Sequence, residues 1–103
     1  NIKPDFKKII NLDGQGLIIS SKSEQFDFVS RYFCPKYGIN EDPVTGSAHT
    51  TLIPYWADKL NKSSMTAKQI SNRGGILYCT NLDERVLIGG KAVLYMKGVI
   101  EIT

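Results

Sequence analysis

The segment 41–49, with the sequence EDPVTGSAH, combines two features that can hold a small anion. Gly46 and Ser47 precede a predicted helix, and the free N–H groups and dipole of a helix start attract carboxylates and phosphates. Asp42 lies five residues before Ser47 and could accept a hydrogen bond from a hydroxyl or amino group of the same molecule. The pattern favours a zwitterionic or hydroxy-acid ligand, although Ser47 would equally suit a plain N-cap and Gly46 a plain turn.

Two other polar residues, His49 and Arg73, could either contact a ligand or serve no role in binding. His49, the only histidine, fits either a ligand contact or a packed core position. Arg73, which two glycines follow, could reach a carboxylate or remain solvated. No second His or Cys stands at zinc-ligand spacing, and neither a GxSxG motif nor a nearby cysteine supplies a nucleophile. The sequence therefore predicts a site without a metal ion or a cofactor.

One central helix and several short strands must position these residues. Apolar residues occur on nearly all sides of segment 47–60, which predicts a buried helix, kinked at Pro54 and with Tyr55 and Trp56 in the core. A short helix is predicted over residues 4–12, and a loop over 35–45 because Pro and Gly recur there. Strands are predicted at residues 17–19, 25–34, 64–71, 75–80, 84–88 and 92–102.

These elements predict an α+β fold, in which a mixed, mostly antiparallel and curved sheet wraps around one central helix. With 103 residues and 42% hydrophobic composition, the chain suits a single domain over residues 1–103 and is too short for two.

Charge and cysteine usage narrow the functional class. The net charge of +3 is scattered along the chain, which does not indicate nucleic-acid binding. Cys34 and Cys79 lack metal or redox spacing and are predicted to be buried reduced thiols. No apolar run is long enough for a signal core or a membrane helix, so we expect no membrane partner and a cytoplasmic location.

Several motifs occur in the order and at the spacing of a known family. They are RYF at 31–33, Pro35, Gly38-Ile39, EDPVTGSAH at 41–49, PYW at 54–56 and QISNRGG at 69–75. On these motifs the chain resembles the PhzF family of phenazine-biosynthesis-like isomerases and epimerases, over residues 17–102. The resemblance implies a diaminopimelate-epimerase-like fold of two similar halves with the active site between them. This chain would be the C-terminal half of such a two-domain enzyme, without the N-terminal half.

The resemblance also implies roles for individual residues. Asp42 and Ser47 would belong to the catalytic site, with Gly46 donating a backbone N–H to the substrate carboxylate. The complete predicted set of substrate-binding residues is Thr45, Gly46, His49 and Arg73. The turn 45–47 contains no thiol, so proton transfer would be of the cysteine-independent kind. The acid/base glutamate of the family belongs to the N-terminal half, and Glu41, although it adds a second carboxylate to the loop, is not that residue.

The predicted function is that of the C-terminal domain of an isomerase or epimerase with a biosynthetic role, acting on a small carboxylate-bearing substrate and inactive alone. The alternative is a non-catalytic module that binds an anion or self-associates. The predicted partners are the missing half or a second copy, because residues 92–102 could pair between two copies in a homodimer.

Overall fold

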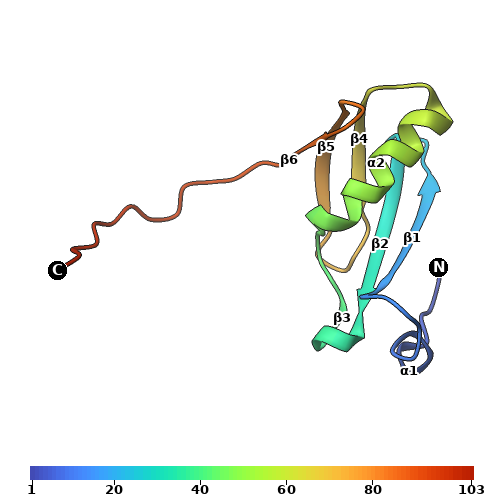
Figure 1. The fold of residues 1–103 in the computed structure, drawn as a ribbon, viewed down its shortest axis with the longest axis horizontal. Coiled ribbons are helices and arrows are strands. Elements are labelled where there is room, and N and C mark those ends of the chain that lie inside the picture. The colour runs from blue at the N-terminus through green and yellow to red at the C-terminus, as the bar shows by residue number, and fades with distance from the viewer.

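The long helix α2 (Gly46–Leu60) lies across one face of a six-stranded sheet, and the core lies between the two (Figure 1). The computed structural model describes residues 1–103. The strands of the sheet are β1 (Leu17–Lys22), β2 (Phe28–Cys34), β3 (Ile39–Glu41), β4 (Ser64–Gln69), β5 (Gly75–Asn81) and β6 (Val86–Gly89). The predicted α+β class is confirmed.

The sheet has the order β1-β2-β4-β5-β6, and β3 pairs with the end of β2. Strands β2 and β4 are parallel, whereas every other pair is antiparallel. A parallel pair needs a long crossover connection, and α2 provides it because it lies between β3 and β4 in the chain. The prediction of a mixed, mostly antiparallel sheet is therefore confirmed.

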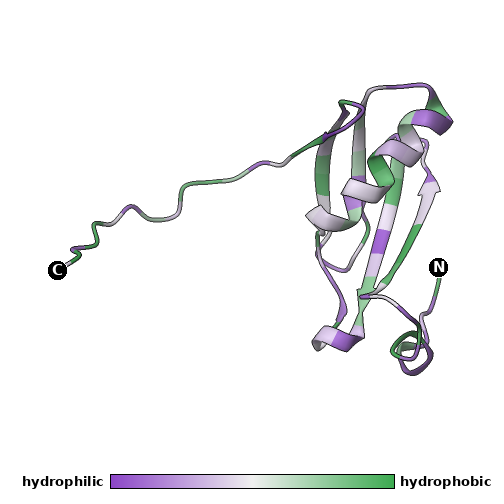
Figure 2. Ribbon diagram, in the orientation of Figure 1, coloured by the Kyte–Doolittle hydropathy of each residue, from purple (hydrophilic) through white to green (hydrophobic).

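Side chains of β2 alternate between the two faces of the sheet, as the sequence predicts. Phe28 and Ser30 contact α2, and the Phe28 ring stacks on Trp56 with ring centres 5.7 Å apart. Phe33 lies on the opposite face, where its ring meets Phe6 of the short helix α1 (Phe6–Ile9) at 6.1 Å between ring centres. Figure 2 shows hydrophobic residues at both ends of β2 and hydrophilic residues in its middle. The long helix thus covers only one face of the sheet.

Helix α2 buries a single stripe of side chains. The buried residues of this stripe are Ala48, His49, Leu52, Ile53, Trp56 and Ala57. On the opposite side of the helix Tyr55 is 52% exposed. The prediction of a helix buried on all sides, with Tyr55 in the core, is wrong because the sheet lies on one side of it only. The helix runs without a break through Pro54.

The two cysteines are buried and free, as predicted. Burial raises the pKa of the Cys79 thiol to about 11. Burial also raises the pKa of the Cys34 thiol above its ordinary value. Both side chains therefore remain protonated near neutral pH and serve as apolar core residues.

Several predicted segments in the N-terminal half of the chain have other bounds in the structure. The predicted strand 25–34 begins only at Phe28. The first helix is shorter than residues 4–12. Asp5 caps its start by accepting a hydrogen bond from the Lys8 N–H at 3.2 Å, and after Ile9 the N–H groups of Asn11 and Leu12 bond to carbonyls only three residues back. The first strand continues past residue 19 to Lys22, since it pairs along its whole length with β2. The predicted loop 35–45 contains a 3-10 turn (Pro35–Tyr37) and the strand β3.

Residues 91–103, called the arm below, extend away from the rest of the molecule (Figure 1). The predicted strand 92–102 is not formed, and no strand follows β6. The large apolar side chains of the arm are exposed, from 77% for Met96 to 98% for Tyr95. A strand needs a neighbouring edge to satisfy its N–H and C=O groups, and the arm meets none within this chain.

No helix of the fold has the length and apolar character that crossing a bilayer requires.

Candidate functional site

The start of α2 is the centre of the predicted site, and it begins one residue earlier than expected. Thr45, with extended backbone angles of φ −118° and ψ 109°, is the N-cap, and Gly46 is the first helical residue. Ser47 is therefore the second residue of the helix, and its predicted role as the N-cap is wrong. The reason is that the backbone already turns into the helix at Gly46.

No side chain caps this helix. The first four N–H groups of a helix have no partner within it. One of them, that of Thr45, donates to the Gln69 Oε1 atom at 2.7 Å. The N–H groups of Gly46, Ser47 and Ala48 remain, and the first two of these residues are exposed. The helix start thus presents a group of backbone donors that an anion can accept.

Thr45 does not cap the helix because its hydroxyl is used elsewhere. This hydroxyl donates a short hydrogen bond to Asp42 Oδ2 and accepts one from Gln69 Nε2 at 3.0 Å. The residue is only 6% exposed. Thr45 was predicted to bind substrate, but the structure places its side chain between two protein groups, where it holds Asp42.

Asp42 keeps one carboxylate oxygen for an external partner. Its Oδ2 atom receives the Thr45 hydroxyl, whereas its Oδ1 atom has no hydrogen bond within the protein. The backbone of Asp42 is held on both sides, by Tyr32 O at 3.0 Å and by Gln69 Nε2 at 2.9 Å. The half-buried carboxylate is thus fixed in place beside the helix start with one free acceptor.

Gly46 and Ser47 are open to solvent. A Cβ atom added to Gly46 would meet nothing within 4 Å, so the space in front of this residue is empty. Ser47 makes no side-chain hydrogen bond, and only its backbone carbonyl is used, by the Thr50 hydroxyl at 2.6 Å. Both residues can therefore contact a ligand directly.

His49 lies beneath the helix start and is completely buried. Its Nδ1 atom lies 2.6 Å from the Thr45 carbonyl oxygen, which can only accept, so Nδ1 carries a proton. Its Nε2 atom lies 3.2 Å from Ser30 Oγ and accepts that hydroxyl when the ring is neutral. Burial lowers the pKa of the imidazole below its ordinary value of 6.5, although the Thr45 hydrogen bond partly opposes this. The structure thus places this predicted binding residue behind the site as a neutral support.

Arg73 lies in the turn between β4 and β5, where its side chain is exposed and makes no hydrogen bond or ion pair. The turn itself contacts the segment that carries Asp42, because Ser71 Oγ donates to the Pro43 carbonyl at 2.7 Å. Arg73 therefore remains a free cation on a turn next to the site.

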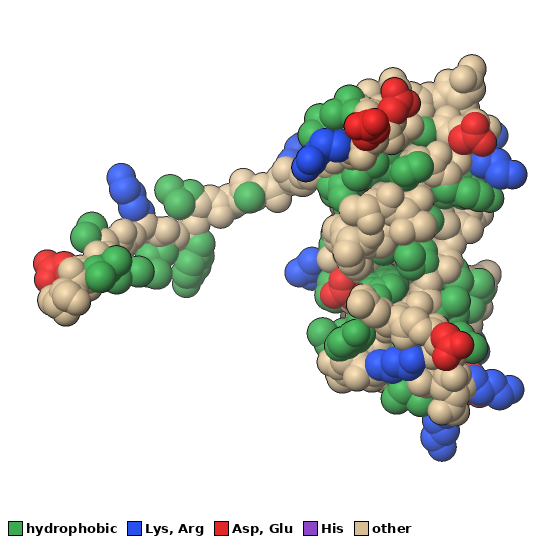
Figure 3. Space-filling view, in the orientation of Figure 1, with side chains coloured by type: hydrophobic (Ala, Val, Ile, Leu, Met, Phe, Trp, Pro, Cys, Tyr) green, Lys and Arg blue, Asp and Glu red, His purple; other side chains and the backbone are tan.

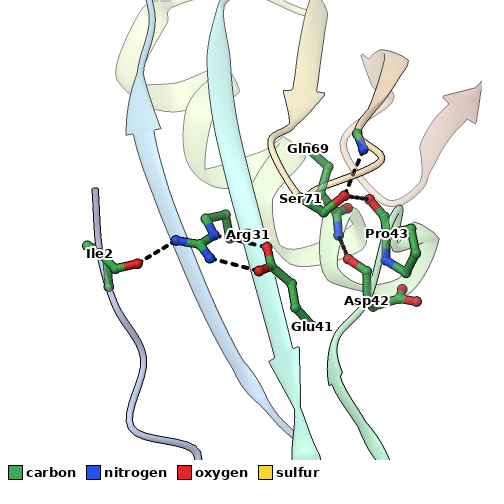
Figure 4. A network of polar contacts seen from close by, with 8 residues as sticks. Ile2, Arg31, Glu41, Asp42, Pro43, Gln69 and Ser71 are labelled. Atoms are coloured by element: carbon green, nitrogen blue, oxygen red, sulfur yellow. Dashed lines mark hydrogen bonds and ion pairs between the residues drawn. The ribbon is translucent and has the colours of Figure 1, made fainter.

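The Glu41 carboxylate pairs with Arg31 and not with the residues around Asp42. Its carboxylate forms a bidentate pair with Arg31, at 2.9 Å from Nε and 2.7 Å from the terminal nitrogen (Figure 4). The pair raises the pKa of the Arg31 guanidinium, and Arg31 also donates to the Ile2 carbonyl at 2.7 Å. The expectation that Glu41 supplies a second carboxylate to the site is wrong, because both of its oxygens are occupied.

Gln69 is the site residue that the residue-by-residue analysis of the sequence overlooked. It is completely buried and bonds to both Asp42 and Thr45. Met65, Ala67 and Gln69 alternate along β4 and share the buried face of that strand. A glutamine that ends a buried apolar face must find hydrogen-bond partners, and this pattern was the available signal.

The site is an open surface. The main hollows of the molecule are lined by other residues, and none includes Asp42, Gly46 or Ser47. No group of three or more His, Cys, Asp or Glu side chains is placed to hold a metal ion. The arrangement can bind a carboxylate at the backbone donors and a hydroxyl or amino group at Asp42.

Comparison with known proteins identifies the family of this chain. The family described as phenazine biosynthesis-like protein (PhzC-PhzF) matches residues 1–98 of the chain. The chain belongs to the PhzF family. A crystal structure of a phenazine biosynthesis PhzC/PhzF protein from Clostridium difficile superposes with a TM-score of 0.86 and 52% identity, over 99% of this chain and 40% of that one. The resemblance on the EDPVTGSAH and QISNRGG motifs is therefore confirmed.

Two PhzF relatives from Pseudomonas aeruginosa, each named as an uncharacterised isomerase, are 50% and 52% identical to this chain over 101 residues. In both cases the match covers 98% of this chain and 39% of the relative. The chain thus spans about two fifths of the length of these PhzF relatives.

The buried state of His49 predicts how stability depends on pH. Unfolding releases the ring into water, where its pKa returns to about 6.5, so the unfolded state takes up a proton more readily than the folded state. The free energy of unfolding should therefore fall as the pH decreases from about 7.5 to about 5.5, a window above the ordinary titration of carboxylates. Urea denaturation followed by circular dichroism at each pH measures this.

The control for this prediction is His49→Gln, which keeps a donor and an acceptor but does not titrate. This variant should be less stable than the parent chain at neutral pH and should lose the dependence on pH in the same window. An equal slope in both proteins would show that His49 is not the group responsible.

Proposed function

We propose that this chain is the substrate-orienting part of a PhzF-type isomerase. In this proposal the N–H groups of Gly46 and Ser47 bind the carboxylate of a small substrate, and Asp42 accepts a hydrogen bond from its hydroxyl or amino group. The observation that carries the proposal is the uncapped start of α2 next to the free Oδ1 atom of Asp42. Family membership supports it, because PhzF relatives are named as isomerases.

The chemistry that fits these groups is proton transfer at a carbon near the carboxylate. Removing such a proton moves negative charge towards the carboxylate oxygens, and fixed backbone donors at a helix start stabilise that charge. Ser47 can add its free hydroxyl to the same oxygens. In this proposal Asp42 and Ser47 act on the substrate itself, and Arg73 adds positive charge at the edge of the site.

Neither cysteine suits the role of proton donor or acceptor here. Cys34 and Cys79 are both buried, and burial keeps the pKa of Cys79 at about 11. This supports a cysteine-independent mechanism. Glu41 is also excluded as the base because Arg31 occupies its carboxylate.

The acid/base glutamate would come from outside this chain. The relatives are more than twice as long as the matched region, which leaves ample sequence for a second half. In this proposal the present chain is the C-terminal domain of the whole enzyme, and the open surface at Asp42 is one wall of a site that the other half completes.

Substitution of Gly46 tests the binding role of the helix start. Proline suits the first helical position, and Thr45 before it already has the extended backbone that proline requires, so Gly46→Pro removes one N–H donor without strain. Loss of one hydrogen bond to a charged group should weaken binding about tenfold. The measurement is an NMR titration of backbone amides with 3-hydroxyanthranilate, which carries a carboxylate, an amino group and a hydroxyl.

The matched control is Gly46→Ala, which keeps the N–H and places its methyl group in empty space. In the parent chain and in this control, the amide signals of Ser47 and Ala48 should shift with similar dissociation constants. Absence of any shift at the helix start of the parent chain would refute carboxylate binding at this position.

The isolated chain should not catalyse isomerisation or epimerisation, because the proposed acid/base glutamate is not among its residues. Incubation with a hydroxyanthranilate of the phenazine pathway, or with an amino acid, in D2O should leave the carbon-bound proton signals unchanged in NMR spectra. Sustained exchange or turnover by the purified chain, above a buffer blank, would show that its own residues suffice.

The second candidate function is a non-catalytic module that binds an anion or associates with itself. The observation that favours it is the exposed arm, on which hydrophobic side chains gather away from the main body (Figure 3). Alternate residues of the arm, Leu94, Met96, Ile100 and Ile102, would share one apolar face if it became a strand. Both β1 and β6 have a free edge, and such a strand could join the edge of a second copy or of the proposed other half of the enzyme.

Removal of the arm tests this second candidate. If the arm pairs between two copies, light scattering should find a dimer for the whole chain and a monomer for a chain that ends at Gly90. The retained fold of the shortened chain can be checked by circular dichroism, since no helix or strand lies beyond Gly89. A monodisperse monomer for the whole chain at high concentration would exclude self-association through the arm.

A further inference from the structure

The turn between β4 and β5, together with the strand residue on either side of it, contacts every residue of the loop that leads into α2. We call residues 69–75 the corner and residues 42–45 the Asp42 loop. Gln69 bonds to Thr45, the last residue of this loop. Figure 4 shows its bond to Asp42, the first residue, and the bond of Ser71 to the Pro43 carbonyl. Gly75 faces the remaining loop residue, Val44. The corner therefore determines the shape of the loop.

Gln69 uses all of its hydrogen-bonding groups in this contact. Its Oε1 atom accepts the Thr45 N–H at 2.7 Å. Its Nε2 atom donates to the Asp42 carbonyl at 2.9 Å and to the Thr45 hydroxyl at 3.0 Å. The side chain is completely buried, so water cannot replace these partners. A network satisfied in this way specifies one conformation of the loop.

The Gln69 amide also fixes the direction of the Thr45 hydroxyl. Because Nε2 donates to this oxygen, the hydroxyl must place its own proton on another acceptor, and Asp42 Oδ2 receives it. A threonine at an N-cap normally accepts a hydrogen bond from the second or third N–H of its helix. Here that N–H remains unused, and the helix start stays open.

The Ser71 and Gly75 contacts leave the loop little freedom to move. Ser71 Oγ donates to Pro43 O at 2.7 Å and accepts the Gly74 N–H at 2.9 Å, so it connects the corner to the loop. A Cβ atom added to Gly75 would lie 2.3 Å from the Val44 Cγ2 atom, so the Val44 side chain or the loop that carries it would have to shift. Glycine is thus required here because the two segments approach each other so closely.

We infer that Gln69 is a positioning residue for the carboxylate site, acting through Thr45 to keep the start of α2 uncapped and Asp42 in place. Ser71 and Gly75 assist by holding the rest of the Asp42 loop. The inference rests on the proposed function, since it assigns the corner a role in binding the substrate carboxylate. It goes beyond that function by predicting that a buried residue without ligand contact controls affinity.

Gln69→Met tests this inference, because methionine has similar length but makes none of the three hydrogen bonds. The freed Thr45 hydroxyl should turn to cap α2 and compete with the ligand. Affinity for 3-hydroxyanthranilate, measured from the amide shifts of Gly46, Ser47 and Ala48, should fall about tenfold. Gln25→Met, at an exposed position, is the matched control and should bind like the parent chain.

A double variant distinguishes positioning from a general loss of structure. Thr45→Val removes the hydroxyl that would otherwise cap the helix, but it also removes the hydroxyl that holds Asp42. The comparison therefore uses benzoate, which has a carboxylate and no group that donates to Asp42. For benzoate, Gln69→Met combined with Thr45→Val should bind more tightly than Gln69→Met alone. If Gln69 only stabilised the fold, the second substitution would deepen the defect. Affinity unchanged by Gln69→Met, or no recovery in the double variant, would overturn the inference.

A steric pair provides a second test if Gln69→Met does not fold. Gly75→Ala should displace the Asp42 loop and weaken binding, and Val44→Ala should restore it by removing the Cγ2 atom that the new methyl group meets. Equal binding by parent chain and Gly75→Ala would contradict the role of the corner. Failure of the parent chain itself to bind would refute the proposed function, so the two ideas fail by different results.

Discussion

The contacts of Phe28 with His49 and Trp56 determine how α2 sits on the sheet. One ring of β2 stacks on two residues of the helix, at 5.9 Å and 5.7 Å between ring centres. Rotation of the helix about its axis would separate both pairs of rings. This packing therefore decides which residues of the first turn face outward, and it exposes Gly46 and Ser47 while Ala48 and His49 face the core.

Solvent exposure and structural support are divided among neighbouring residues of one motif. Gly46 and Ser47 make no side-chain contact that the fold requires, whereas Thr45 and His49 are buried and fully hydrogen-bonded. An uncapped helix start costs about 1 kcal/mol relative to a capped one. The hydrogen bonds that Gln69 makes to the Asp42 loop offset this cost, so the fold can leave the start of α2 without a side-chain cap.

Local patterns in the sequence predicted the elements well and their surroundings less well. Alternation identified β2, and the EDPVTGSAH motif identified the start of α2, because both signals lie within a few residues. The burial of α2 was overestimated, since Tyr55 is apolar enough for a core position and only the one-sided sheet shows that it is exposed. The roles of Gln69 and Glu41 depend on partners from distant strands. Residues 92–102 have strand character, but a strand also needs an edge to join.

The parallel pairing of β2 with β4 has a consequence for when the site forms during folding. Asp27 and Thr66 bond to each other across 39 residues of sequence. Closing so long a loop is slower than forming the adjacent β4–β5 hairpin. Asp42 follows β2 and Gln69 ends β4, so the hydrogen bond between them also joins segments that are far apart in the sequence. A short peptide with the EDPVTGSAH sequence would lack the site's geometry, because the side chain that holds the Asp42 loop belongs to a distant strand.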